Sequence, residues 1–208
     1  TQSLFDEFEA GDPRRDLTIG IPAEGERDEA EVSYLGNSYF NLKISYWEHG
    51  AFPSLAHATR SPMNYRLMRA SDALLLFAEA ALESGRSLAD AKWALEEGRN
   101  RARLMASDPA TLPAFPAYRG YTDSADDLRE AIRHERRVEL GGEGHRWFDI
   151  IRWGIAAQIF DKNTGSYPRT ETEEAVAEMG NFVPGRSELF PLPAEEINLN
   201  PMPQNPGY

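Results

Sequence analysis

Apolar residues recur at helical spacing through the middle of the chain. The helix predicted from Arg66 to Ser84 has a face of leucines and alanines, namely Leu67, Leu74, Leu75, Ala78, Ala81 and Leu82. Gly85 ends this helix, and Ser87 with Asp90 resembles a capping box that starts another. That second helix runs to about Met105 on a stripe of Leu88, Ala91, Leu95, Ala102 and Met105. The pattern therefore predicts two antiparallel helices.

A second helical pair is predicted between Leu128 and Trp153, on either side of a glycine-rich corner. Leu128 and Ile132 start the apolar stripe of the first helix, and Gly141 with Gly142 follows where a helix commonly ends at positive φ. After Gly144 the helical period resumes, at Trp147, Ile150, Ile151, Ile155 and Ile159. The two pairs together predict tetratricopeptide-like hairpins, which bury their faces against neighbouring repeats.

In the rest of the chain, apolar residues do not recur at helical spacing over any long stretch. Residues 1–64 look like an irregular segment that wraps over helices, with a short strand within Ser38 to Trp47. The tail, residues 161–208, is rich in loops, with one short helix expected around Glu171 to Met179 and one helical turn at Ala194 to Ile197. We therefore expect one all-α domain over residues 1–208, with helical hairpins in 65–160, long irregular loops and little β-structure.

Charged residues are interleaved with the apolar stripes of the second pair. Glu135, Glu139 and Glu143 lie four apart, whereas Arg146, Asp149 and Arg152 lie three apart. Such rows can be a solvated surface, the usual outcome for charged runs. Because tryptophans stand beside them, we favour a structural network of charge-assisted bonds between the two helices. Its members are Glu135, Arg137, Glu139, Arg146, Asp149 and Arg152.

Composition excludes several classes of protein. A hydrophobic share of 41% and a charged share of 27% are typical of a soluble globular protein. The net charge of −12 argues against nucleic-acid binding, which requires a basic face. The chain has no cysteine and no run of eighteen apolar residues, so neither disulfides nor a membrane-spanning helix is expected.

Five stretches in order resemble one known family. They are DPRRDLT from Asp12, RLMRASDALLLFAEA from Arg66, RNRA from Arg99, ERRVELGGEGHRWFDIIRWG from Glu135, and LFPLPAEEI from Leu189 leading to the closing QNPGY. Together they resemble the SusD/RagB proteins, surface lipoproteins that capture glycans. The chain departs from the family pattern just before RNRA, where Glu96 and Gly98 replace an asparagine and an aliphatic residue.

The resemblance carries several expectations. It implies a tetratricopeptide-like fold in an outer-membrane lipoprotein at the cell surface. Such a protein binds an oligosaccharide without a cofactor and partners a SusC-like TonB-dependent transporter. Family members begin with a signal peptide, an acylated cysteine and a helical half that this sequence does not contain, so we expect the C-terminal portion of a longer protein. Contact with the membrane would then be only through a lipid anchor outside this chain.

No catalytic or metal-binding pattern stands out. The best-placed carboxylates have an arginine nearby, and an arginine lowers the carboxyl pKa that a general acid needs raised. The four histidines include no i,i+4 metal-binding pair, and no glycine-rich phosphate loop follows a predicted strand. We therefore expect no enzyme activity, no metal and no cofactor.

Two loop clusters have a composition suited to sugars, whose apolar faces stack on aromatic rings beside hydrogen-bonding groups. One contains Tyr46, Trp47 and Phe52, and the other contains Tyr118, Arg119 and Tyr121. The alternative, which we favour for the aromatic rings, is that they anchor the loops on the helices. Two rival functions stay open: a helical scaffold that docks a peptide or protein, and a glycoside-processing enzyme.

Overall fold

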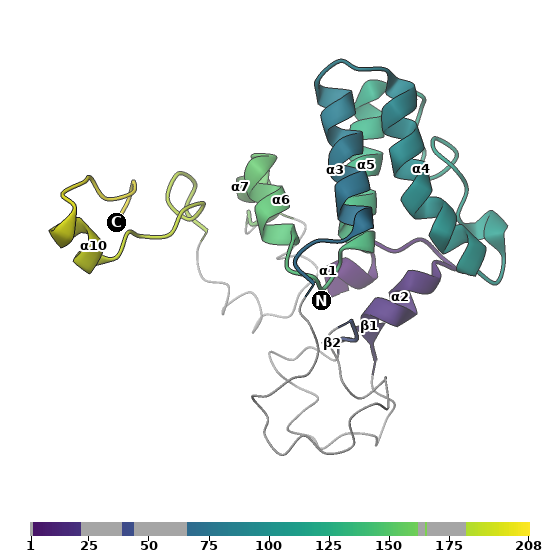
Figure 1. Cartoon of the computed structure of the whole chain (residues 1–208). Helices are drawn as coiled ribbons and strands as arrows, with labels where there is room; N and C mark the ends of the chain where they lie inside the picture. The colour runs from purple at the N-terminus through teal and green to yellow at the C-terminus, as the bar shows by residue number, and fades with distance from the viewer. Residues whose placement is uncertain (1, 22–38, 44–65, 162–164, 166–181) are drawn as a thin grey trace. The chain divides into compact units, whose positions relative to one another are not determined.

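The computed structural model describes residues 2–21, 39–43, 66–161, 165 and 182–208 (Figure 1). It divides into two compact units. The first, here called the helical unit, comprises residues 4–21 and 39–145. The second, here called the C-terminal unit, comprises residues 1–3, 22–38 and 146–208. Each is described by itself.

Helices α3 (Ala70–Glu83), α4 (Leu88–Met105) and α5 (Ala125–Glu139) pack together in the helical unit (Figure 1). A short turn joins α3 to α4, which makes them antiparallel neighbours. Gly85 in this turn has a φ of 70°, a conformation that suits glycine. The Ser87 hydroxyl then accepts a hydrogen bond of 3.2 Å from the Ala89 amide and so caps α4. The predicted hairpin is confirmed, although α3 begins at Ala70 rather than at Arg66.

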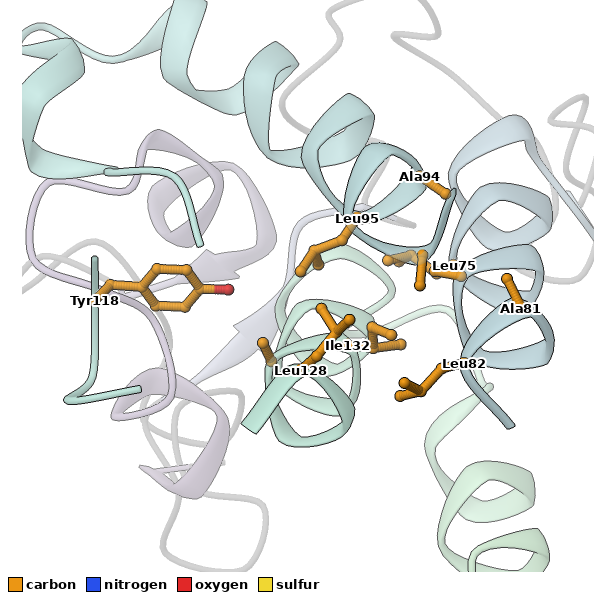
Figure 2. Packing of buried hydrophobic residues seen from close by; sticks show 11 residues of the cluster. Leu75, Ala81, Leu82, Ala94, Leu95, Tyr118, Leu128 and Ile132 are labelled. Atoms are coloured by element: carbon orange, nitrogen blue, oxygen red, sulfur yellow. The ribbon is translucent and has the colours of Figure 1, made fainter. Parts of the chain in front are cut away.

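The main apolar core lies between these three helices (Figure 2). Large side chains fill its centre, in particular Leu75, Leu95, Leu128 and Ile132, each fully buried. Small residues such as Ala78, Ala91, Ala94 and Ala131 lie between them and let the helices approach closely. Because the packing is dense, truncating one of these leucines to alanine would cost about 2–5 kcal/mol. The core therefore fixes the position of α5, which carries the charged residues described below.

Helix α5 ends at a corner where glycine is required. Gly142 has a φ of 77°, and a Cβ added to it would lie 2.7 Å from the Asn41 side-chain amide. The Asn41 amide nitrogen donates to the Gly142 carbonyl oxygen at 2.7 Å. Positive φ and this close approach together exclude a larger residue. The expected glycine-rich corner is thus confirmed.

The N-terminal part of the chain is more regular than the sequence suggested. Helix α1 (Gln2–Phe5) lies at the start of the chain, and α2 (Pro13–Thr18) begins after Asp12, whose carboxylate accepts from the Arg14 amide at 2.9 Å. Strand β1 (Ile19–Gly20) pairs antiparallel with β2 (Phe40–Asn41), Ile19 opposite Asn41. Strand β2 lies in the predicted strand region, whereas the prediction of an irregular segment missed both helices.

The C-terminal unit contains α6 (Arg146–Arg152), α7 (Ala156–Ile159) and α10 (Ala194–Leu199). The helix predicted to continue to Ile159 is broken at Gly154, whose φ is 68°. Helix α10 starts after Pro193, as expected, and runs two residues beyond the predicted turn. The helix expected around Glu171 to Met179 falls outside the described residues.

The described residues are mostly helical, with one pair of two-residue strands. The expected all-α, tetratricopeptide-like class with long irregular loops is therefore confirmed. None of the described helices combines the length and the apolar composition needed to cross a bilayer.

Candidate functional site: a buried charge network and an aromatic loop

Two acidic side chains of α5 lie in the interior of the helical unit. Glu135 and Glu139 are four residues apart, so both project from the same face, and their side chains are 0% and 1% exposed. A buried carboxylate is costly unless it is paired and hydrogen-bonded. The arginines that bind Glu135 and Glu139 offset this cost of burial.

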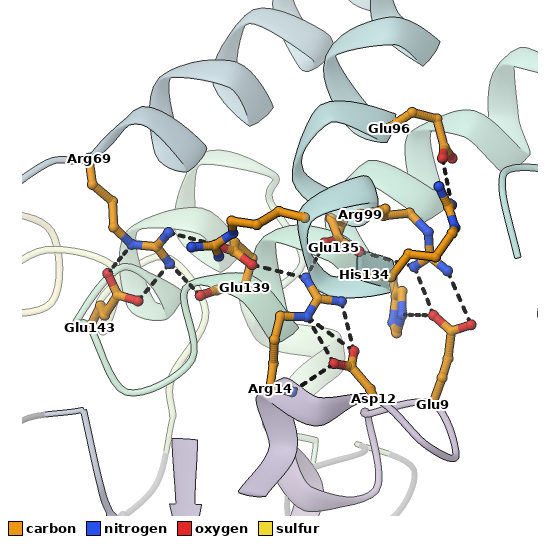
Figure 3. Close-up of polar contacts among 12 residues, drawn as sticks. Glu9, Asp12, Arg14, Arg69, Glu96, Arg99, His134, Glu135, Glu139 and Glu143 are labelled. Carbon is orange, nitrogen blue, oxygen red and sulfur yellow. Dashed lines mark hydrogen bonds and ion pairs between the residues drawn. The ribbon is translucent and has the colours of Figure 1, made fainter. Parts of the chain in front are cut away.

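Glu135 lies between two arginines that come from distant parts of the sequence (Figure 3). Arg14 of α2 donates to one carboxylate oxygen, and Arg99 of α4 donates to the other at 3.1 Å. Arg14 is itself held by Asp12, through bonds of 3.0 Å from Nε to Oδ1 and 2.7 Å from Nη2 to Oδ2. This fork-to-fork pairing fixes the guanidinium plane before it meets Glu135.

Glu139 carries a still denser set of donors. Arg14 donates to it at 2.9 Å and Arg69 at 2.6 Å, and Arg101 is a third partner. Burial alone would raise the pKa of Glu139, but the hydrogen bonds and charges of Arg69 and Arg14 outweigh it and lower the pKa to about 2. Glu139 is therefore a permanent anion at neutral pH.

The network continues past the end of α5. Arg69 also donates from Nε to Glu143 at 2.7 Å, and Lys43 donates to Glu143 at 2.8 Å. Lys43 and Arg69 both donate to the Glu139 carbonyl oxygen, at 2.7 and 2.5 Å. Carbonyl groups in the last turn of a helix lack intrahelical partners, so these cations cap α5.

His134 forms the other end of the network. Its Nδ1 lies 2.7 Å from Glu7 Oε1 and its Nε2 lies 3.4 Å from Glu9 Oε1. Glu7 accepts a further bond of 2.6 Å from Arg137, and Glu9 accepts one of 2.8 Å from Arg99. Burial would raise the pKa of Glu7 and of Glu9, but the bonds from His134 and the arginines lower both to about 2.

Arg99 connects this network to the segment from Phe115 to Tyr121, here called the aromatic loop. Its guanidinium carbon lies 3.8 Å from the centre of the Tyr118 ring, and Nη2 donates to the Pro113 carbonyl oxygen at 3.0 Å. Glu96, one turn earlier on α4, accepts from the Phe115 amide at 2.8 Å. Glu96, which departs from the family pattern, thus holds the start of the aromatic loop.

The aromatic loop places its residues in different environments. Tyr118 is only 6% exposed and packs edge-to-face on Tyr121 at 5.3 Å, so its ring has no free face for a ligand. Tyr121 is partly buried, and Arg119 is 40% exposed. Arg119 has a φ of 52°, which costs a non-glycine residue about 1–3 kcal/mol, and its Nη1 donates to the Glu7 carbonyl oxygen at 3.3 Å.

The structure separates the predicted site residues into three groups. Glu135, Arg137 and Glu139 lie in the network of the helical unit, with Arg119 and Tyr121 at its edge. Arg146, Asp149 and Arg152 lie on α6 of the C-terminal unit, where Arg152 bonds Asp149 at 3.0 Å and both arginines approach the Trp153 ring. Tyr46, Trp47 and Phe52 fall outside the described residues.

The described partners of Glu135 and Glu139 come from distant elements. Both glutamates bind arginines of α2 and α4, and Glu139 also binds Arg69, the residue before α3. The bonds to the α6 arginines that the alternating rows suggested stay a prediction. Tyr118 lies in the core, as the anchoring interpretation has it. The sequence analysis also missed Glu7, Glu9 and Arg14. Arg14 belongs to the DPRRDLT stretch, so that motif contained the available signal.

The network's chemistry is that of a scaffold. Glu135 and Glu139 each bind more than one arginine, and the lowered pKa of Glu139 is the opposite of what a general acid needs. Within the part of the chain that the structure describes, no group of three or more acidic or histidine side chains has an arrangement that could hold a metal ion.

Comparison with known proteins agrees with this architecture. The fold class is that of an all-α, tetratricopeptide-like protein. A family model described as "SusD family" matches residues 3–208, and the chain belongs to that family.

Named relatives and one solved structure are similar to this chain. SusD-like protein P2 of Formosa agariphila is 29% identical over 213 residues, which cover 99% of this chain and 39% of the relative. A SusD-like protein of Bacteroides ovatus is 33% identical over 95 residues, 45% of this chain and 14% of the relative. The crystal structure of a SusD superfamily protein from Bacteroides vulgatus is 24% identical, with a TM-score of 0.69, and the match covers 100% of this chain and 44% of that one. The chain thus spans less than half the length of these proteins.

Proposed function

We propose that this chain belongs to a carbohydrate-binding protein of the bacterial outer surface, which captures an oligosaccharide and passes it to a SusC-like TonB-dependent transporter. The observation that carries the proposal is the SusD family match over residues 3–208. Attachment to the outer membrane is through a lipid anchor, and binding is non-covalent and needs no cofactor.

On this chain we assign sugar contact to the exposed side of the aromatic loop. Arg119 presents a planar set of hydrogen-bond donors, and Tyr121 adds a ring and a hydroxyl beside it. The Glu7 contacts, with 3.5 Å between Arg119 Nη2 and Glu7 Oε1, hold the guanidinium at the surface. The buried ring of Tyr118 packs edge-to-face against Tyr121 and so holds the Tyr121 ring in place. Preorganised groups of this kind lose little conformational entropy when a ligand binds.

Calorimetry with a panel of plant, algal and host oligosaccharides tests the proposal. We expect Arg119→Ala and Tyr121→Ala each to weaken binding at least about tenfold, equivalent to roughly 1.4 kcal/mol, with unchanged circular dichroism. Trp93→Ala is the matched control, because Trp93 is a 54% exposed aromatic that contacts Phe77 rather than the aromatic loop. Its affinity should equal that of the wild type.

The outcomes separate the parts of the proposal. Binding that survives both loop substitutions would overturn the assignment to the aromatic loop but not carbohydrate capture. If neither this chain nor the full-length product of its gene bound any oligosaccharide, carbohydrate capture itself would be overturned. Co-purification with a SusC-like transporter is the separate test of the partner.

A further inference from the structure

His134 has an environment that determines its protonation state. Its side chain is 3% exposed, and each ring nitrogen faces a carboxylate oxygen, Nδ1 that of Glu7 and Nε2 that of Glu9. An ionised carboxylate only accepts hydrogen bonds, whereas a neutral imidazole has just one N–H to donate. The imidazolium is the form that satisfies both contacts, because it donates from both nitrogens.

Charged and titratable groups from several elements surround this ring. Glu7 and Glu9 come from the N-terminal segment, Arg119 and Tyr118 from the aromatic loop, and Arg99 and Arg137, which bind the same glutamates, from α4 and α5. Burial and the nearby Arg119 oppose a charge on the ring. The hydrogen bonds to Glu7 and Glu9 outweigh both effects and raise the pKa of His134.

The two carboxylates lie on a segment that contacts both α5 and the aromatic loop. We define the N-terminal strap as residues 7–12, between α1 and α2. The strap contacts His134 and Arg137 of α5 through Glu7, and it contacts Arg119 of the loop through the Glu7 carbonyl oxygen and carboxylate. Loss of the His134 proton would remove the hydrogen bond to one strap glutamate and the charge attraction to both.

We propose that protonated His134 is a pH-sensitive clamp that holds the N-terminal strap on α5 and, through Glu7, fixes the Arg119 turn of the aromatic loop. The clamp is closed while His134 is charged and loosens as pH rises and the proton is lost. It goes beyond the proposed function, because it concerns the conformation of the chain alone.

The direction of the pH effect follows from the shifts in pKa. A raised histidine pKa stabilises the closed state fully below the unfolded value of 6.5, and this contribution is lost as pH rises through the folded value. Glu7 and Glu9, with pKa values of about 2, contribute fully above their unfolded value of 4.5. The clamp is therefore tightest between about pH 4.5 and 6.5 and weakens on the alkaline side.

Nuclear magnetic resonance titration of the imidazole signals tests the protonation state directly. We expect His134 to titrate above 6.5 and Glu7→Gln to lower that pKa. Glu130→Gln is the control, because Glu130 lies on the exposed side of α5 and pairs with Arg133. A His134 pKa at or below 6.5 in the wild type would overturn the proposal.

Hydrogen exchange tests the mechanical part. Once corrected for the intrinsic effect of pH, exchange in residues 7–12 and 115–121 should rise by up to about tenfold for each pH unit between 6.5 and the His134 pKa and level off above it, while the α3–α4 hairpin stays protected. His134→Gln should remove this pH dependence, and His145→Gln should retain it. Equal protection of both segments on either side of the His134 pKa in the wild type would overturn the clamp, and this measurement does not depend on the variant folding.

One consequence rests on the proposed function. If the aromatic loop binds oligosaccharide, affinity falls above the His134 pKa in the wild type but not in His134→Gln. The titration and the exchange experiment use no ligand, so a failure of carbohydrate binding and a failure of the clamp are distinguishable.

Discussion

Two segments near opposite ends of the chain are held by different forces. The strap and α2 are fixed by charged groups whose partners are buried, such as Arg14 against Glu135 and Glu139. The tail, residues 182–208, has mainly neutral hydrogen bonds near the surface, besides the Arg186 guanidinium 4.5 Å from the centre of the Tyr208 ring. Gln204 exchanges two bonds with the Leu192 backbone at 2.7 and 2.9 Å, and Asn205 donates to the Phe190 carbonyl oxygen at 2.6 Å. Tyr208 donates to the Leu189 carbonyl oxygen at 3.0 Å.

The difference lies in what is left behind when one partner is removed. A neutral group near the surface regains water, so losing its hydrogen bond costs about 1 kcal/mol. A buried ion that loses its partner stays desolvated, and the cost rises to about 3–5 kcal/mol. Removing one partner therefore destabilises the N-terminal segment much more than it destabilises the tail.

The largest expected effect is at Glu135. Glu135→Gln leaves Arg14 and Arg99 facing a neutral amide in the interior, because both arginines donate to this carboxylate. We expect the free energy of unfolding in urea to fall by about 3–5 kcal/mol. Glu130→Gln, whose side chain is 58% exposed, should change it by less than about 0.5 kcal/mol. Equal, small effects of both would contradict the distinction.

The second effect is acid sensitivity of the network. Glu139 has a pKa of about 2 in the folded chain and an ordinary value of 4.5, so its contribution is present above pH 4.5 and is lost as pH falls toward 2. This single carboxylate accounts for about 3 kcal/mol over that window. Thermal unfolding between pH 5 and 2 measures it. Glu139→Gln should start less stable at pH 5 and lose less on acidification, and a parallel pH curve would contradict the assignment.

The smallest effect is expected in the tail. Gln204→Ala removes both bonds to Leu192, and we expect about 1–2 kcal/mol of local destabilisation without a change in the core. Limited proteolysis should cut within residues 182–208 faster, while α3 to α5 stay protected. Asn200→Ala, which removes one exposed bond to Glu196, is the control and should leave the cleavage rate unchanged.

The sequence predicted the long helices well, because apolar spacing and capping residues are signals that lie within the helix or at its ends. The spacing of leucines and alanines predicted α3 and α4, and Gly85, Ser87 and Gly142 marked their limits or the end of α5. Helix α2 is only six residues long, too short to show a period. Its one available signal was Asp12 followed by Pro13, an N-cap and first-turn pair.

Partner choice in the network could not be predicted in the same way. The row of glutamates on α5 correctly suggested paired carboxylates, but Arg14 is 121 residues from Glu135 and Arg99 is 36 residues from it. Nothing in the spacing distinguishes these arginines from the nearer ones of α6. The sequence predicted no particular role for His134, because only the fold shows the two acids beside it.

From the long sequence separation of these ion pairs we expect a particular order of folding. The α3–α4 hairpin closes through a short turn, whereas Glu7 must find Arg137 across 130 residues and Arg14 must find Glu139 across 125. Closing such long loops is entropically expensive and slow. Docking of the strap is therefore a late event, and during synthesis the strap leaves the ribosome long before its partners on α5 exist. Interactions that form after the transition state act mainly on the unfolding rate. We therefore expect the buried arginines to slow unfolding of the helical unit rather than to speed its folding.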